Sequence, residues 1–142
     1  MTRQEAEIQL QKLFGFKQFF DLQWKVIENL LAGRRVLFIE KTGFGKSLCF
    51  QFPATQLQGV TIVFSPLIAL MRDQVRSMQE KGIRAAAINS NQEDLENTAI
   101  ITKAQKNELD ILYIAFSSGL SGTYQSSVIA AEELMGKYPG RK

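Results

Sequence analysis

The feature that most constrains the fold is an alternation of short apolar runs with segments of helical periodicity. Four apolar runs have the length of buried strands and cover residues 34–40, 59–65, 84–89 and 110–116. Helix signals occur around them, at residues 4–14, 21–32, 45–57, 66–81, 92–107 and 124–135. Strands that alternate with helices pair in parallel, so the pattern predicts an α/β protein with three layers. We expect a mainly parallel sheet of about four strands, with helices on both of its faces.

Local signals define several elements more closely. The first helix is expected to turn Ile8 and Leu13 toward the core, and Asp21 is a candidate cap for the second helix. Ser65 and Pro66 have the residue types of an N-cap and a first helical turn. The helix that follows them carries an apolar stripe made of Leu67, Leu70, Met71, Val75 and Met78. The chain of 142 residues suits a single domain with a hydrophobic core.

The first apolar run leads into a glycine-rich turn, K-T-G-F-G-K-S, at residues 41–47. Backbone N–H groups at a helix start carry partial positive charge, and the two glycines let the chain bend closely around an anion. Lys46 can reach terminal phosphates, and the Ser47 hydroxyl can ligate Mg²⁺. The strict pattern G-x-x-x-x-G-K-[ST] is not met, because Glu40 occupies the position of its first glycine. The alternative is an ordinary glycine turn, but the order strand, glycines, Lys-Ser, helix favours phosphate binding.

Composition excludes several kinds of chemistry. The chain has no histidine and a single cysteine, so serine–histidine and cysteine–histidine catalysis are excluded within it, and a zinc site nearly so. One cysteine cannot form an internal disulfide, which favours a reducing compartment, and we expect a cytoplasmic protein. The apolar runs are too short to span a membrane. The net charge of +3 is compatible with nucleotide or nucleic acid and proves neither.

Four stretches of the sequence resemble RecQ-type ATP-dependent DNA helicases, in the order that this family uses. The resemblance covers about residues 8–115 and is carried by residues 13–54, 60–75, 82–92 and 108–115. It implies that residues 1–115 form the N-terminal part of the first RecA-like, P-loop lobe of such a helicase. It also implies ATP or ADP with Mg²⁺ as the cofactor and single-stranded DNA as a further partner.

The resemblance assigns roles to individual residues. The family's adenine-recognising glutamine falls on Gln23, whose amide can both donate and accept. The nucleotide's phosphates and Mg²⁺ would be held by Thr42, Gly43, Phe44, Gly45, Lys46 and Ser47. The family's first DNA-contacting motif falls on the segment that contains Ser65, Pro66 and Arg72. An N-cap followed by a core helix explains these last residues without DNA, and Arg72 can equally be a surface charge.

The sequence departs from the family pattern in ways that bear on activity. Phe20 stands where the family usually has arginine, which weakens the expected polar contacts around the nucleotide. The family's Asp-Glu-x-His motif is missing, as is its second lobe. Glu93, Asp94 and Glu96 begin a polar helix, where they complement the helix dipole, so no catalytic residue is assigned. We therefore expect nucleotide binding without useful ATPase or unwinding activity.

The missing part of the lobe also affects the sheet. In the family, strands that are absent here lie beside the strand that precedes the phosphate loop. We expect the remaining strands to close into a compact four-stranded sheet. An unpaired edge would otherwise stay exposed and could lead to oligomers.

Residues 116–142 resemble a different family, the DegV-type fatty-acid-binding proteins, through the motif S-S-G-L-S-G-T-Y-Q at residues 117–125. That resemblance implies a carboxylate-binding role for Ser117 or Ser118. A Ser/Gly turn that caps a last helix is the alternative. The chain is therefore predicted to join two families near residues 110–117, and gene fusion, design and assembly error are all compatible with the junction.

Four functions stay open at this point. A helicase-derived nucleotide-binding domain ranks first by ancestry. The others are a single-stranded DNA-binding module, a fatty-acid or carboxylate binder, and a folded chain without activity.

Overall fold

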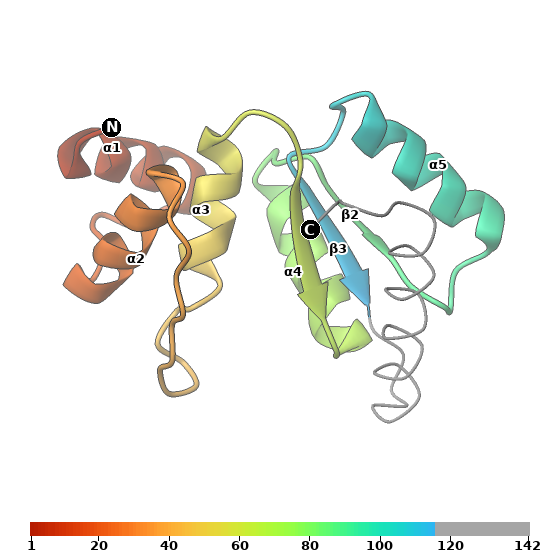
Figure 1. Ribbon diagram of the computed structural model, residues 1–142, viewed down its shortest axis with the longest axis horizontal. Helices are drawn as coiled ribbons and strands as arrows, with labels where there is room; N and C mark the ends of the chain where they lie inside the picture. Colours follow the sequence, from red (N-terminus) through yellow and green to blue (C-terminus); the bar gives the residue numbers. More distant parts are fainter. Residues whose placement is uncertain (116–142) are drawn as a thin grey trace, which may run out of the picture.

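Three helices begin the chain and pack together beside a small parallel sheet (Figure 1). The computed structural model describes residues 1–115; the predicted turn and last helix in residues 116–142 lie outside this range. Helix α1 spans Arg3–Phe14, α2 spans Asp21–Leu31 and α3 spans Leu48–Gln56. All three elements were expected from the helical periodicity and the glycine-rich turn.

Helix α1 shows how an inward position can be misassigned. Thr2 and Glu5 form a capping box at its start. Its buried face is a single row made of Ala6, Leu10 and Phe14. The inward prediction for Ile8 is wrong, because a residue two positions after Ala6 lies about 200° around the helix, and Ile8 is 66% exposed. Leu13 packs against the core as predicted.

Helix α2 is capped by a residue other than the predicted one. Phe20 is the N-cap and Asp21 is the first helical residue, so the prediction of Asp21 as the cap is wrong. The side chain of Gln23 supplies the cap, because its Oε1 accepts from the Phe20 backbone N–H at 3.0 Å. Asp21 instead pairs with Arg3 at 2.7 Å and joins α2 to α1 at the surface.

The strand predicted over residues 34–40 is not formed. This segment has no regular secondary structure, and the side chains of Leu37 and Ile39 are 87% and 82% exposed. Figure 1 shows it running beside α2 and α3, away from the sheet. Backbone N–H and C=O groups of a strand need a neighbouring strand as partner, and none within residues 1–115 pairs with this segment. The prediction of a strand at residues 34–40 is therefore wrong, and the sheet has three strands within residues 1–115, where about four were expected.

The three strands confirm the predicted α/β class and parallel pairing. Strand β1 spans Thr61–Ser65, β2 spans Ala85–Ile88 and β3 spans Ile111–Ala115. Their order in the sheet is β1-β3-β2, with Tyr113 opposite Val63 on one side and Ala87 on the other. β3 is therefore the central strand, although it is the last of the three along the chain.

Two further helices make the crossovers between the strands. Helix α4, Ile68–Glu80, joins β1 to β2, and α5, Asp94–Gln105, joins β2 to β3. The two crossovers step across the sheet in opposite directions, so right-handed connections place their helices on opposite faces, as a three-layer fold requires. Figure 1 shows α4 behind the strands. Helix α5 contacts β2 but has no buried residue.

Helix α4 begins later than the sequence suggests. Ser65 ends β1 and Leu67 is the N-cap, so the prediction of Ser65 and Pro66 as N-cap and first turn is wrong. The start of the predicted apolar stripe is also wrong, because Leu67 and Leu70 are 59% and 48% exposed. The rest of the stripe packs on the core, at Met71, Val75 and Met78.

The helical part and the sheet share one hydrophobic core. The Phe52 ring in α3 lies 5.0 Å from that of Phe19 and 6.4 Å from that of Phe14. Gln51, also in α3, donates to the Tyr113 hydroxyl at 3.1 Å. Tyr113 is fully buried, and burial raises the pKa of its hydroxyl. Helix α3 therefore connects the glycine-rich loop to the central strand.

Candidate nucleotide-binding site

The loop of residues 41–47 leads into α3 and presents free backbone donors. Gly43 and Gly45 have φ angles of 86° and 82°, a left-handed conformation that suits glycine. Within residues 1–115, the backbone N–H groups of Gly45, Lys46 and Ser47 have no hydrogen-bond acceptor. Three successive free N–H groups at the start of a nine-residue helix are typical of a phosphate-type anion site.

Lys46 is folded back over its own loop. Its Nζ donates to the backbone carbonyl oxygens of Glu40 and Lys41, both at 2.7 Å. These bonds hold the ammonium against the start of the loop whose end carries the free N–H groups. The positive charge is therefore already at the loop, and carbonyl oxygens are the groups that an incoming anion would replace.

The hydroxyl of Ser47 contacts a helix other than its own. Ser47 is the N-cap of α3, yet its side chain makes no capping hydrogen bond. Its Oγ instead accepts from Nε2 of Gln74, on α4, at 3.3 Å. The structure thus joins the predicted magnesium ligand to the helix that follows β1.

Gln23 is buried against the loop. It is 4% exposed, and its Nε2 donates to the carbonyl oxygens of Phe44 and Gly45 at 3.2 and 3.3 Å. A Cβ at residue 45 would lie 2.6 Å from that nitrogen, so any other residue there would displace the Gln23 amide in addition to being strained by the positive φ angle. The structure brings Gln23 to the predicted nucleotide site, where its amide holds the loop.

Aromatic rings surround the loop on the side of Gln23. The Phe44 ring lies 5.7 Å from that of Phe20 and 5.9 Å from that of Phe38. Phe20 is 60% exposed and takes the place of the arginine expected from the family pattern. Thr42 and Gly43 are exposed in the same loop.

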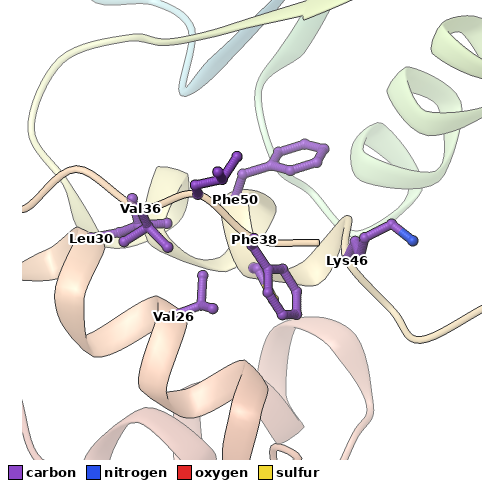
Figure 2. Close-up of a pocket in the computed structure, with 8 residues that line it drawn as sticks. Val26, Leu30, Val36, Phe38, Lys46 and Phe50 are labelled. Carbon is purple, nitrogen blue, oxygen red and sulfur yellow. The ribbon is translucent and has the colours of Figure 1, made fainter. Parts of the chain in front are cut away.

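An apolar hollow of about 390 Å³ opens beside the loop, between α2, α3 and the segment 36–38. Figure 2 shows Val26, Leu30, Val36 and Phe38 around it, with the amine of Lys46 pointing away. Lys46 contributes to the lining of the hollow, but its amine is directed elsewhere. Cys49 also lines it, and burial raises the pKa of this thiol to about 11, so the thiol stays protonated at neutral pH.

The loop suits a magnesium ion that arrives with a nucleotide. Among residues 1–115, no group of three or more Cys, Asp or Glu side chains is placed to hold a metal. Mg²⁺ commonly takes one or two protein ligands and completes its shell with phosphate oxygens and water. One hydroxyl at Ser47 fits that arrangement. Glu93, Asp94 and Glu96 lie exposed at the start of α5, as the sequence suggested.

The predicted DNA-contacting residues are not all brought together. Ser65 and Pro66 lie at the carboxyl end of β1, and Arg72 lies in the next helix. Arg72 lines a groove of about 620 Å³ between α4, the end of β2 and the start of α5, to which Ser65 and Pro66 do not contribute. Arg76, Asn89 and Asn91 also line this groove. Ser117 and Ser118 fall outside the part of the chain that the structure describes.

Sequence reasoning missed Gln74 as a member of the site. A signal for it exists, because Gln74 lies three residues after Met71 and four before Met78. Both methionines are buried, so this spacing places the glutamine on the buried side of α4. A polar residue within an apolar stripe needs a partner, and the sequence offers no way to choose that partner.

The parallel sheet and the free N–H groups at the start of α3 together define an α/β domain with a phosphate-type loop. The sequence model of the DEAD/DEAH box helicase family matches residues 20–127, well over half of the chain. The chain therefore belongs to this family. The match includes the first part of the segment that resembles DegV-type proteins, and that second resemblance stays a prediction.

Curated relatives include several RecQ helicases. The chain is 39% identical to the ATP-dependent DNA helicase RecQ of Synechocystis over 119 residues, which are 84% of this chain and 25% of the relative. It is 41% identical to RecQ of Pasteurella multocida over 113 residues, 80% of this chain and 18% of the relative. It is 42% identical to the ATP-dependent helicase wrn-1 of Caenorhabditis elegans over 93 residues, 66% of this chain and 9% of the relative. The chain thus spans a quarter or less of these relatives. No helix within residues 1–115 has both the length and the apolar character to cross a membrane.

Proposed function

We propose that the chain is a helicase-derived domain that binds ADP or ATP with Mg²⁺ through residues 42–47. One observation carries the proposal: three successive N–H groups without an acceptor in residues 1–115 belong to the loop that carries Lys46, whose ammonium is bonded to the carbonyl oxygens of Glu40 and Lys41. An unsatisfied cluster of donors next to a positive charge favours a polyphosphate over any neutral ligand. Membership in a helicase family with ATP-dependent relatives supports the same ligand.

Each residue of the loop has a proposed part in binding. Lys46 exchanges the carbonyl oxygens of Glu40 and Lys41 for phosphate oxygens, and Gly45 allows close approach of the backbone. Ser47 supplies a hydroxyl oxygen to Mg²⁺, which neutralises phosphate charge when it is bound. Gln23 would meet the adenine edge by exchanging its bonds to Phe44 and Gly45 for bonds to the base, and Thr42, Gly43 and Phe44 complete the enclosure.

We further propose that these 142 residues bind nucleotide without hydrolysing it. Phosphoryl transfer in such proteins needs carboxylates that hold the metal and orient water, and an arginine finger alone is worth about 10³–10⁵ in rate. The acidic residues that begin α5 lie exposed on a helix, with no metal-binding cluster among residues 1–115. The DNA-unwinding activity named for the relatives would then require parts of those proteins that this chain does not match.

The test is a titration of the purified chain with fluorescent ADP and Mg²⁺. We expect Lys46→Ala to weaken binding at least tenfold, about 1.4 kcal/mol or more, because its ammonium is folded onto the loop. Lys25→Ala, an exposed lysine on α2, is the matched control and should bind like the unmodified chain. Equal affinity of Lys46→Ala and the control would refute the proposal.

Single-stranded DNA binding is the second candidate, favoured by the groove that Arg72 and Arg76 line. Cations that contact phosphates give an affinity that falls steeply with salt. We expect Arg72→Ala to weaken binding of a labelled oligonucleotide and Lys46→Ala to leave it unchanged. Ser65 and Pro66, outside the groove, would add contacts at the end of β1. Binding that does not depend on salt would exclude this candidate.

Three further proposals rest on the sequence predictions. Ser117 or Ser118 would hold a fatty-acid carboxylate, and the absence of a thermal shift on fatty-acid titration would remove that role. The chain would form oligomers through an unpaired edge of its sheet, as the sequence predicts. A constant monomer mass in light scattering across protein concentrations would exclude these oligomers.

The lone cysteine supports a cytoplasmic location.

A further inference from the structure

We propose that Gln74 is a positioning residue that sets the orientation of the Ser47 hydroxyl for magnesium. This inference rests on the proposed nucleotide function and adds to it a residue from a separate helix. It concerns a contact between α3 and α4 that spans 27 residues of sequence.

Gln74 is not a solvated surface glutamine. Its neighbours one turn away on the same face, Met71 and Met78, are 0% and 1% exposed, and Gln74 itself is partly buried. Within residues 1–115, its amide has one hydrogen-bond partner, the Ser47 Oγ at 3.3 Å. A polar side chain in this position is costly unless it is bonded, so the contact with Ser47 determines where the amide points.

Ser47 gives the second, independent observation. A serine at an N-cap usually accepts from an N–H of the first helical turn, and Ser47 makes no such bond. Its hydroxyl is turned toward α4 instead, where Gln74 donates to it. The helix that carries Ser47 therefore does not orient this hydroxyl, and α4 does.

The chemistry of a hydroxyl explains what this orientation supplies. The oxygen has two lone pairs and one hydrogen. When Gln74 donates to one lone pair, the other is left to face a cation at the loop. The amide can also turn to present its Oε1 to the hydroxyl hydrogen, which must point away from a cation. Either arrangement keeps an oxygen lone pair directed at the metal.

The experiment measures ADP affinity as a function of free Mg²⁺ for the unmodified chain and two variants. We expect Gln74→Ala to raise the half-saturating Mg²⁺ concentration by roughly tenfold, a typical loss when a partner of a metal ligand is removed. Its ADP affinity in EDTA should stay unchanged. Gln79→Ala is the matched control, because it removes a glutamine hydrogen bond from the same helix, to the Ala85 carbonyl at 2.8 Å. The control should keep the Mg²⁺ requirement of the unmodified chain.

Two results would overturn the inference while the nucleotide proposal stands. One is an unchanged Mg²⁺ requirement in Gln74→Ala. The other is an equal loss of affinity with and without Mg²⁺, which would indicate a structural role alone. If the unmodified chain binds no nucleotide, the proposed function fails and the role toward magnesium fails with it.

A double-mutant cycle tests the contact itself without any ligand. If Gln74 and Ser47 are bonded, the fall in melting temperature of the double variant Gln74→Ala/Ser47→Ala is smaller than the sum of the two single falls. In the presence of ADP, Gln74→Ala should not raise the Mg²⁺ requirement of Ser47→Ala any further. Additive effects in both measurements would show that the two side chains act independently, and the inference would be wrong.

Discussion

Two apolar segments of similar composition differ in secondary structure and burial in this molecule. Residues 36–39, V-L-F-I, precede the glycine-rich loop and have no regular structure, with Leu37 87% exposed. Residues 111–115, I-L-Y-I-A, form the central strand of the sheet, with Tyr113 fully buried. The second segment has a parallel neighbour on each side, and the first has none within residues 1–115. An apolar run therefore becomes a strand when partners are present, and its own residues do not decide it.

The comparison also bears on the loop. The free N–H groups at residues 45–47 follow the unpaired segment directly, so their backbone is held by α3 on one side and by the amide of Gln23 on the other. A phosphate-type loop can thus keep its local geometry without a strand paired within residues 1–115 in front of it, because helix α3 and the buried side chain of Gln23 hold it.

A large effect on stability is expected at the junction of the two parts. Tyr113→Ala should lower the free energy of unfolding by about 3–5 kcal/mol, since it removes a fully buried ring between β3 and α3. Tyr113→Phe loses only the hydrogen bond with Gln51 and should cost about 1 kcal/mol. Urea unfolding followed by Trp24 fluorescence and by circular dichroism measures both variants. If the signal from Trp24 in α2 did not shift with Tyr113→Ala, the two parts would not share a core.

A smaller effect is expected at the start of the paired strands. Arg84 donates to the Asp110 carboxylate from its side chain and its backbone N–H, which lowers the pKa of Asp110. Because the folded state favours the charged form, the stabilisation is present above the unfolded-chain pKa and is lost as pH falls through the lowered folded pKa. Asp110→Asn should cost about 0.2–1 kcal/mol at neutral pH, a small value because Arg84 is half exposed.

The pH dependence checks this assignment of the ion pair. Urea unfolding of Asp110→Asn and of the unmodified chain should give stabilities that converge as pH is lowered through the range in which Asp110 takes up a proton. A stability difference that stays constant over this range would mean that the pair contributes nothing through charge.

The smallest effect is expected in the unpaired segment. Leu37→Lys should change the free energy of unfolding by less than about 0.5 kcal/mol, because the side chain is already in solvent. The matched change Ile111→Lys puts a charge at a site that is 0% exposed and should prevent folding. Circular dichroism and urea unfolding compare the two. A loss of more than about 2 kcal/mol in Leu37→Lys would show that residues 36–39 pair or pack in solution.

The sequence predicted elements whose signals are local. Alternating apolar runs and helical periodicity were enough for the parallel α/β class, for the three strands at Thr61, Ala85 and Ile111, and for the glycine-rich loop. The errors arise where other residues or elements determine which face of a helix is buried or where a helix begins. Ile8 faces outward because Ala6 and Leu10 set the buried side of α1. The start of α4 lies after Leu67 because β1 extends through Ser65.

The residues of the candidate site also fall into two groups: those that local sequence predicted and those that only the structure brought to the site. Local sequence identified Lys46 and Ser47, since the order of glycines, lysine and serine before a helix has a direct physical meaning. A resemblance assigned Gln23 to the nucleotide site, whereas its contact with Phe44 and the contact of Gln74 with Ser47 came from the fold alone. Contacts between elements far apart in sequence depend on how helices pack, which no local pattern encodes.

The amino-acid sequence by itself determined the residue types at the glycine-rich loop, the alternation of β1, α4, β2, α5 and β3, and the kinds of catalysis that the lack of histidine excludes. Tertiary structure decided which apolar runs pair, which face of each helix is buried, and which side chain orients the Ser47 hydroxyl. The reason is that hydrogen bonds between strands and packing between helices join residues that are distant in the chain. Their formation depends on whether a partner is present in space, as the unpaired residues 36–39 and the central strand β3 show.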